Sequence, residues 1–300
     1  MRPPWLACRS LGAPDTHSSD TNITNPDDMR LINSRNNSKA AASRTMMAHG
    51  MGLLALALAL LQIGCAGQPE GDDPRPKVPH VPGDPSKVGQ LTVLTRKECL
   101  KIADSYVNHK WTATVANIHH GPDAAGIRVD TPDGSYQVPG KAPGFWTTAS
   151  ENVSIPYCWG GMDTPDSFDR AVAQGKFAGD VCTDEKRRLL DDGVSKQTCG
   201  VDCSGLVSRC WKLDWPCSTR EIPFICEPLA SFDDLKPGDA VNFENAHVML
   251  VAGFTDATHQ KILTYQTGTP RSWRVTKGWV SIDWLKRAGY KPWRYKGIRD

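Results

Sequence analysis

The spacing of hydrophobic and polar residues predicts helices in the middle of this chain and strands toward its end. Residues 96–111, RKECLKIADSYVNHKW, carry apolar side chains at helical spacing. Residues 166–175 and 183–192 predict two short helices, and Thr183 offers a partial cap for the second. Residues 117–150 contain several Gly and Pro and are expected to form loops.

The pattern is clearest after residue 200, in the stretch GVDCSGLVSRCW. Four apolar residues fall on one stripe of a helix that begins near Asp202: Leu206, Val207, Cys210 and Trp211. Strands follow at residues 239–243, 247–254 and 261–267, and residues 273–275 with the aromatic C-terminal end add further sheet or its cover. A helix followed by an antiparallel sheet predicts an α+β fold.

An apolar run near the N-terminus predicts export. Residues 53–63, LLALALALLQI, are too few to span a bilayer but suit the core of a signal peptide. A Gly-Cys pair follows at once and resembles a bacterial lipoprotein signal, in which Cys65 becomes the lipidated first residue, although Gln62 stands where an aliphatic residue is usual. The alternative is cleavage after Ala66 or Gly67 and free secretion.

These features divide the chain into four parts. Residues 1–45 form a polar extension that suits no signal peptide, so we expect translation to start at Met46, Met47 or Met51. Residues 46–65 are the signal peptide, and residues 66–88 are a Pro/Gly-rich tether. Residues 89–300 form the folded domain. We expect it at the cell envelope, anchored to a bacterial membrane by lipid and facing the periplasm or the outside.

Charge and residue spacing exclude two classes of partner. The net charge of +2 and the lack of a long basic run argue against nucleic-acid binding. No CxxC pair occurs, and Cys199 with Cys203 lacks histidines at ligand spacing, so no metal and no other cofactor is predicted.

Export would favour disulfides among the cysteines beyond Cys65. Eight are present: Cys99, Cys158, Cys182, Cys199, Cys203, Cys210, Cys217 and Cys226. Short loops favour the pairs 182–199 and 217–226, but the sequence does not fix the connectivity. If Cys203 is a reactive thiol, seven remain, and at least one more is unpaired within the chain.

Cys203 is the candidate nucleophile. It lies at the predicted start of a helix, where the helix dipole and free N–H groups lower a thiol pKa and could hold an oxyanion. A nucleophilic cysteine needs a base, and of the eight histidines only His247 opens a strand that a helix could pack on. The hairpin would place His247 opposite Thr267, within one residue, so Gln266 is the first candidate to orient the imidazole and Thr264 the second.

Four segments occur in the order found in the NlpC family of papain-like cysteine peptidases: PYCWGG (156–161), DCSGLV (202–207), LKPGD (235–239) and HVMLVAGF (247–254). This resemblance implies a papain-like fold and hydrolysis of amide bonds in peptidoglycan stem peptides, commonly next to D-glutamate. It implies Cys203 as nucleophile and His247 as base. It also implies that Tyr157 lies in the cleft, and that Asp202 and Ser204 contact the stem peptide.

The chain departs from this family in two insertions, residues 112–152 and 162–201, which we expect to wall the cleft. The third catalytic residue of the family is often His, and no matching His is present. Other functions stay open: a thiol amidase or acyltransferase acting on another amide or ester, and a non-catalytic envelope lipoprotein that binds cell wall. In the last case Cys203 is half of a structural disulfide and Asp202 is only a helix cap.

Overall fold

The computed structural model describes residues 81–268 and 272–300. The proposed extension, the signal peptide with its lipidation site Cys65, and most of the tether lie outside these residues. No helix in the described residues is long and apolar enough to cross a membrane.

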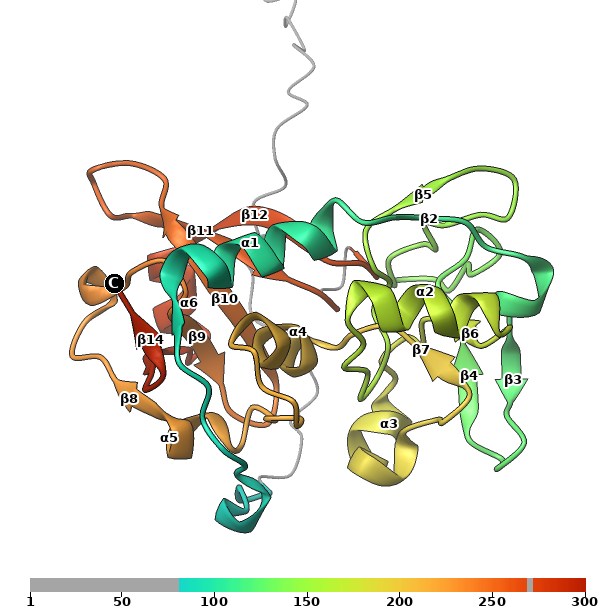
Figure 1. The fold of residues 1–300 in the computed structure, drawn as a ribbon, viewed down its shortest axis with the longest axis horizontal. Coiled ribbons are helices and arrows are strands. Elements are labelled where there is room, and N and C mark those ends of the chain that lie inside the picture. The colour runs from blue at the N-terminus through green and yellow to red at the C-terminus, as the bar shows by residue number, and fades with distance from the viewer. Residues whose placement is uncertain (1–80, 269–271) are drawn as a thin grey trace, which may run out of the picture. The chain divides into compact units, whose positions relative to one another are not determined.

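A six-stranded sheet is the largest element of the fold, and all its neighbouring strands are antiparallel (Figure 1). The spatial order is β12-β11-β10-β9-β13-β8. The strands are β8 (Cys226–Pro228), β9 (Ala240–Phe243), β10 (His247–Phe254), β11 (Lys261–Gln266), β12 (Thr276–Ser281) and β13 (Lys291–Tyr295). Thr264 and Gln266 point to one face of β11 and Tyr265 to the other, as alternation requires.

Helices cover both faces of this sheet. α1 (Arg96–Val107) and α4 (Cys203–Cys210) pack together, and α4 lies against β10. Val248 and Leu250 join the core on the α4 side, whereas Met249 and Val251 join the core on the side of α6. The second core is closed by α6, whose bounds are Ile282–Arg287. The period-two pattern of HVMLVAGF therefore fills two cores at once.

The two insertions fold into short elements beside the sheet, drawn in green and yellow in Figure 1. β2 pairs with β5 and β3 with β4, both antiparallel, and β6 pairs in parallel with β7. The elements are β2 (Lys110–Trp111), η2 (Val115–Asn117), β3 (His120–Pro122), β4 (Arg128–Asp130), β5 (Asn152–Val153), α2 (Pro165–Ala173), β6 (Phe177–Ala178), α3 (Asp184–Leu189), η3 (Leu190–Gly193) and β7 (Thr198–Cys199). Here η denotes a 3₁₀ helix.

The two ends of the domain meet. β1 pairs in parallel with β14, and Leu94 lies opposite Ile298. The remaining elements are η1 (Pro85–Lys87), β1 (Leu94–Thr95), α5 (Ile222–Ile225), η4 (Phe232–Asp234) and β14 (Ile298–Arg299).

The last residue of the LKPGD segment, Asp239, has a structural role close to the place where the two ends of the domain pair. Asp239 is fully buried and accepts hydrogen bonds from the guanidinium groups of Arg96 and Arg294, at 2.9 and 2.7 Å, and from the Lys236 N–H. Its carboxylate ties the start of α1 to strands β9 and β13.

The coarse fold class is confirmed, because the described residues are a mixture of helices and strands. β10 matches the predicted strand at both ends, and the helices predicted at 166–175 and after Asp202 are present. The helix predicted at 96–111 ends earlier, at Val107, because Asn108 leaves helical geometry and the next residues pair with β5. The helix predicted at 183–192 is α3, continued by the 3₁₀ turn η3.

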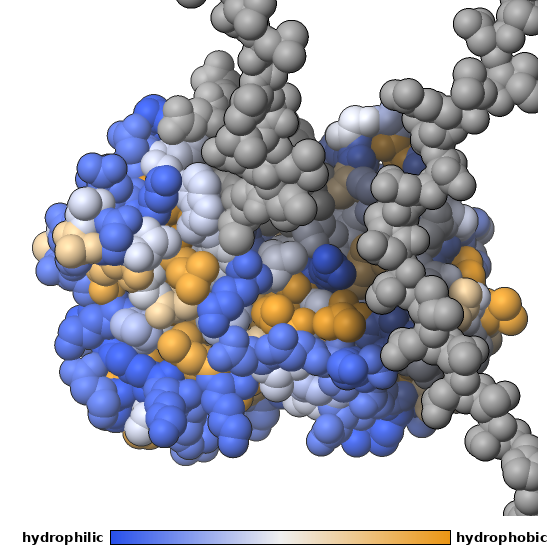
Figure 2. Space-filling view, turned by 90° about the horizontal axis from the view of Figure 1, so that it is seen from above, coloured by the Kyte–Doolittle hydropathy of each residue, from blue (hydrophilic) through white to orange (hydrophobic). Residues whose placement is uncertain are grey.

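Exposed hydrophobic side chains are spread along the described chain rather than gathered in one segment. The large ones are Val93, Val115, Val138, Val153, Leu189 and Phe224. On the face drawn in Figure 2, hydrophobic residues are exposed among hydrophilic ones. Such scattered exposure is ordinary for a folded domain.

Candidate active site

Cys203 is the first residue of α4, as the sequence predicts. Asp202 caps the helix: its Oδ1 accepts the Gly205 N–H at 2.6 Å and the Ser204 hydroxyl at 2.8 Å. The cap role of Asp202 is therefore confirmed. The backbone N–H of Cys203 has no acceptor among the described residues, as expected for a first-turn donor. It is available to an oxyanion.

The segments PYCWGG and DCSG pack directly on each other. The Gly160 N–H donates to Asp202 Oδ2 at 3.1 Å, and the Asp202 N–H donates to the Gly161 carbonyl at 2.9 Å. A Cβ atom at Gly205 would collide with that same carbonyl oxygen. Glycine at this position of the motif is what lets the start of α4 approach the turn.

A narrow cavity of about 110 Å³ opens at the start of α4. Cys203 and His247 both line it, together with Tyr157, Asp202, Ser204 and Gly268. The backbone N–H of Val248, the residue after His247, favours the thiolate and acts to lower the pKa of Cys203. The structure therefore brings five of the six site residues predicted for the folded domain to one cavity.

His247 reaches the cavity because it is the first residue of β10. Alternation along the strand turns Val248 and Leu250, rather than His247, toward the face that α4 covers. His247 lies just beyond that contact, beside the β9–β10 turn, and is half-buried. A histidine at position 248 would be buried against α4.

Gln266 is the predicted site residue that does not line this cavity among the residues described. In the β10–β11 pair Leu250 lies opposite Tyr265, and continuing that register puts Gln266 opposite Met249 and Gly268 opposite His247. The printed pairing ends at Leu250, so the position of His247 opposite Thr267, within one residue, stays a prediction. Gln266 Oε1 is buried and accepts no hydrogen bond from a described residue, so this oxygen does not orient the imidazole. The Thr264 hydroxyl donates to the Gly278 carbonyl instead.

Tyr157 is buried under the cavity wall. Burial raises the pKa of Tyr157 well above its usual value, and the Tyr157 hydroxyl acts to lower the pKa of Cys182. The Tyr157 ring packs against Trp273, 5.6 Å between centroids, and against Gly268. Cys182 is a neighbour of the site that the sequence analysis missed, because it lies in an insertion and carries no motif.

Gly268→Ala should disturb the site by displacing Tyr157. Gly268 has a φ of +80°, and an added Cβ would overlap the Tyr157 ring. We expect a loss of at least about 1–2 kcal/mol in the free energy of unfolding from the backbone conformation alone. Urea titration measures it. Gly278→Ala is the matched control, because no atom lies within 4 Å of its added Cβ; equal losses in the two variants would contradict the packing role.

The predicted lowering of the Cys203 pKa is wrong for the free protein. Burial, together with the Asp202 carboxylate, raises the pKa of the thiol to about 12, and the Val248 N–H and the Arg187 guanidinium only partly oppose this. The helix dipole acts on a sulfur that has lost its water, and desolvation is the larger effect. With its pKa raised in this way, the thiol is expected to be neutral before substrate binds.

Alkylation of Cys203 by iodoacetamide should accordingly accelerate about tenfold per pH unit between pH 7 and 10, since only the thiolate reacts. Peptide mass mapping would follow the label at Cys203, which is half-buried, whereas the other seven described cysteines are buried. A rate that levels off below pH 8 would contradict the raised pKa and indicate a thiolate already paired with His247.

The disulfide predictions are not met. All eight described cysteines are free thiols, so neither 182–199 nor 217–226 is bonded. The sulfurs serve other contacts: Cys158 lies 3.2 Å from the Thr198 hydroxyl, and Cys217 and Cys226 fill the core beside α4.

The insertion 162–201 forms one wall of the cavity, as expected, whereas the prediction for residues 112–152 is wrong, because none of them lines it. Arg187, Leu190, Asp191 and Val194 line it. The indole N–H of Trp159 donates to the Leu190 carbonyl at 3.1 Å and so fastens this wall to the PYCWGG segment. Trp159 itself also lines the cavity.

Other residues line the cavity that no motif in the sequence pointed to. Arg220 and Asn245 line the cavity, and Asn245 Nδ2 is buried without a partner among the described residues. The end of the predicted tether docks here: the Val81 N–H donates to Asn245 Oδ1, and Lys87 pairs with Asp191 at 3.0 Å. Residues 81–88 are thus attached to the domain rather than extended away from it.

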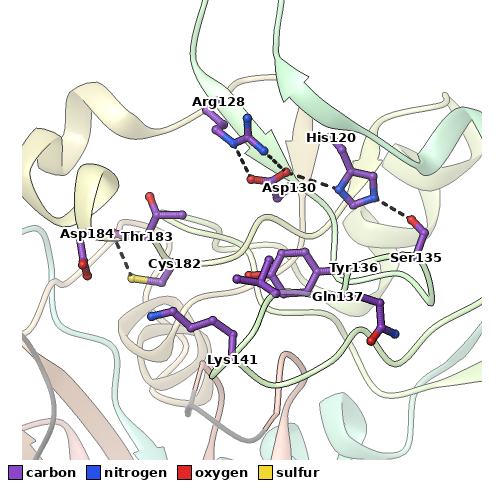
Figure 3. A pocket seen from close by; sticks show the side chains of 11 residues that line it. His120, Arg128, Asp130, Ser135, Tyr136, Gln137, Lys141, Cys182, Thr183 and Asp184 are labelled. Atoms are coloured by element: carbon purple, nitrogen blue, oxygen red, sulfur yellow. Dashed lines mark hydrogen bonds and ion pairs between the residues drawn. The ribbon is translucent and has the colours of Figure 1, made fainter.

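A second and larger cavity, about 480 Å³, lies in the insertions (Figure 3). Its charged groups largely satisfy one another. Arg128 forms a two-pronged pair with Asp130, and His120 bonds Asp133 and Ser135. Cys182 and Tyr136 line this cavity and belong to the same hydrophobic cluster as Tyr157, which lines the first. Size alone does not make it the reactive site, since the nucleophile is in the smaller cavity.

No group of His, Cys, Asp and Glu that could hold a metal ion is found within the described part of the chain. Comparison with protein-family models, curated proteins and solved structures finds no match to this chain.

Proposed function

We propose that this protein is an exported cysteine hydrolase of papain-like fold that cleaves amide bonds in peptidoglycan stem peptides. One observation carries the proposal: Cys203, at the start of α4, lines the same cavity as His247, the first residue of β10. Helix-borne thiol and strand-borne imidazole are the parts that nucleophilic catalysis needs. The substrate class rests on the resemblance of the four segments alone.

Catalysis starts from the neutral thiol. His247 accepts the Cys203 proton as the sulfur attacks the amide carbonyl, and the carbonyl electrons move to oxygen, where the Cys203 N–H can bind the anion. The oxyanion collapses, the C–N bond breaks, and imidazolium returns the proton to the leaving amine. Water, deprotonated by His247, then cleaves the thioester and restores the thiol. Proton transfer from a thiol of pKa about 12 to an imidazole is unfavourable in free energy. Substrate binding must therefore make this proton transfer easier.

The test is incubation of the purified protein with defined muropeptides and mass spectrometry of the products. We expect a new free amine and a new carboxylate within the stem peptide, formed by the wild type and not by Cys203→Ala. Intact muropeptides after prolonged incubation with the wild type would refute the peptidase proposal, and products that persist in Cys203→Ala would refute the nucleophile.

A second candidate is a non-catalytic envelope protein that binds cell wall. The raised pKa of Cys203 favours it, because a neutral thiol is a poor nucleophile. Such a protein would sediment with purified cell wall and release no fragments. The lipid anchor at Cys65 and the attachment to a membrane are proposals for either candidate, and labelling with a fatty-acid analogue tests them.

A further inference from the structure

Arg187 stands in the wall of the cavity because a buried ion pair holds its helix. The preceding residue, Lys186, is almost fully buried and donates to Asp180 Oδ2 at 2.5 Å and to the Gly193 carbonyl at 3.1 Å. Asp180 is itself joined to the PYCWGG segment, through its N–H to the Tyr157 carbonyl and its carbonyl to the Trp159 N–H. α3 therefore has a fixed position relative to Cys203.

The charged side chains that line the cavity differ in how many hydrogen bonds and ion pairs they form. Asp202 accepts hydrogen bonds from Gly160, Ser204 and Gly205, and Asp191 is paired with Lys87 and lies 4.0 Å from Arg220. Arg187 forms no ion pair with any carboxylate of the described residues. Arg187 lines the same cavity as Cys203, and its charge acts to lower the pKa values of Cys203, Tyr157 and Cys182.

A half-buried guanidinium without a counter-ion, beside a nucleophile, is suited to hold an anion of the substrate. Guanidinium binds carboxylates through two parallel hydrogen bonds, and such charge-assisted bonds are stronger than neutral ones. The narrow cavity brings any bound group close to both Arg187 and Cys203.

We propose that Arg187 is a specificity residue that binds a free carboxylate next to the scissile amide, as in a γ-glutamyl linkage whose α-carboxylate is free. This inference rests on the proposed function of the same cavity and adds the substrate feature that the cavity selects. In this proposal, the insertion 162–201 positions the Arg187 guanidinium in the wall of the cavity.

Two peptides test it: L-Ala-γ-D-Glu-L-Lys, and the same peptide with the α-carboxylate converted to a carboxamide. The wild type should favour the carboxylate peptide in kcat/KM by about 10- to 100-fold, the range expected for a hydrogen bond to a charged group. Arg187→Gln should abolish that preference. Arg188→Gln is the matched control, because Arg188 is the next residue, is exposed and does not line the cavity.

A binding measurement separates this proposal from the proposed catalysis. In Cys203→Ala, calorimetric titration should give tighter binding of the carboxylate peptide, and adding Arg187→Gln should equalise the two affinities. That result would stand even if the wild type cleaves neither peptide. An unchanged preference in Arg187→Gln, equal affinities in Cys203→Ala, or no binding of either peptide would overturn the role of Arg187.

Discussion

Cys203→Ala and His247→Ala should each lower the rate of stem-peptide hydrolysis by about 10⁴-fold or more, and the double variant should be no slower than the worse single one. The reason is that thiol and imidazole act as one unit: without the base, a thiol with a pKa of about 12 stays protonated, and without the sulfur the imidazole has no nucleophile to activate. Single-turnover kinetics on a muropeptide measures all three variants.

His259→Ala is the matched histidine control. His259 lies in the β10–β11 turn, stacks on Phe254 with 3.7 Å between ring centroids, and is half-exposed, away from the cavity. Its replacement should leave the rate within a few-fold of the wild type. Additive losses in the Cys203/His247 double variant would mean that the two side chains act separately. If His259→Ala lost as much activity as His247→Ala, the assignment of His247 as the base would be wrong.

The parts of the site that the sequence could predict are those governed by local pattern. Helical spacing after Asp202 located the start of α4 and with it Cys203, and the continuous apolar run 247–254 located β10. Both depend on periodicity and capping, which act between residues close in sequence. The position of His247 follows from the start of β10, because the first residue of the strand lies beyond the contact between α4 and the sheet.

What the sequence could not predict depends on contacts between distant segments. The pKa of Cys203 is decided by burial, which no local pattern reveals, and it overrides the helix dipole that the pattern does reveal. The free thiols are a second example: export favours disulfides in general, but pairing needs particular geometry between residues far apart in the chain. Arg187 lies in an insertion without a motif, and only the packing of α3 on Asp180 brings it to the cavity.

Lys186→Met should be the most destabilising of the substitutions considered, by about 3–5 kcal/mol in the free energy of unfolding, because it leaves the Asp180 carboxylate buried without its cation. Both side chains are almost inaccessible, and the ammonium also satisfies the Gly193 carbonyl. Urea unfolding followed by tryptophan fluorescence measures the loss. Lys196→Met is the control, since Lys196 is exposed and in no ion pair of the described residues, and it should change stability by only a few tenths of a kcal/mol.

The pH dependence identifies the buried carboxylate as the cause. Burial raises the pKa of Asp180 from 3.8 to about 7, and the Lys186 ammonium opposes that rise. A raised folded-state pKa means that stability from this group is present at low pH and is lost as the pH rises through the folded value. Without Lys186 the pKa of Asp180 rises further, so the stability deficit of Lys186→Met relative to the wild type should grow above pH 7, after the wild-type loss has ended.

Adding Asp180→Asn to Lys186→Met should remove this growth of the deficit with pH and recover part of the stability. A deficit that is constant with pH, or a double variant less stable than Lys186→Met, would show that lost packing and not an unpaired charge is responsible, and α3 with Arg187 would then need another anchor.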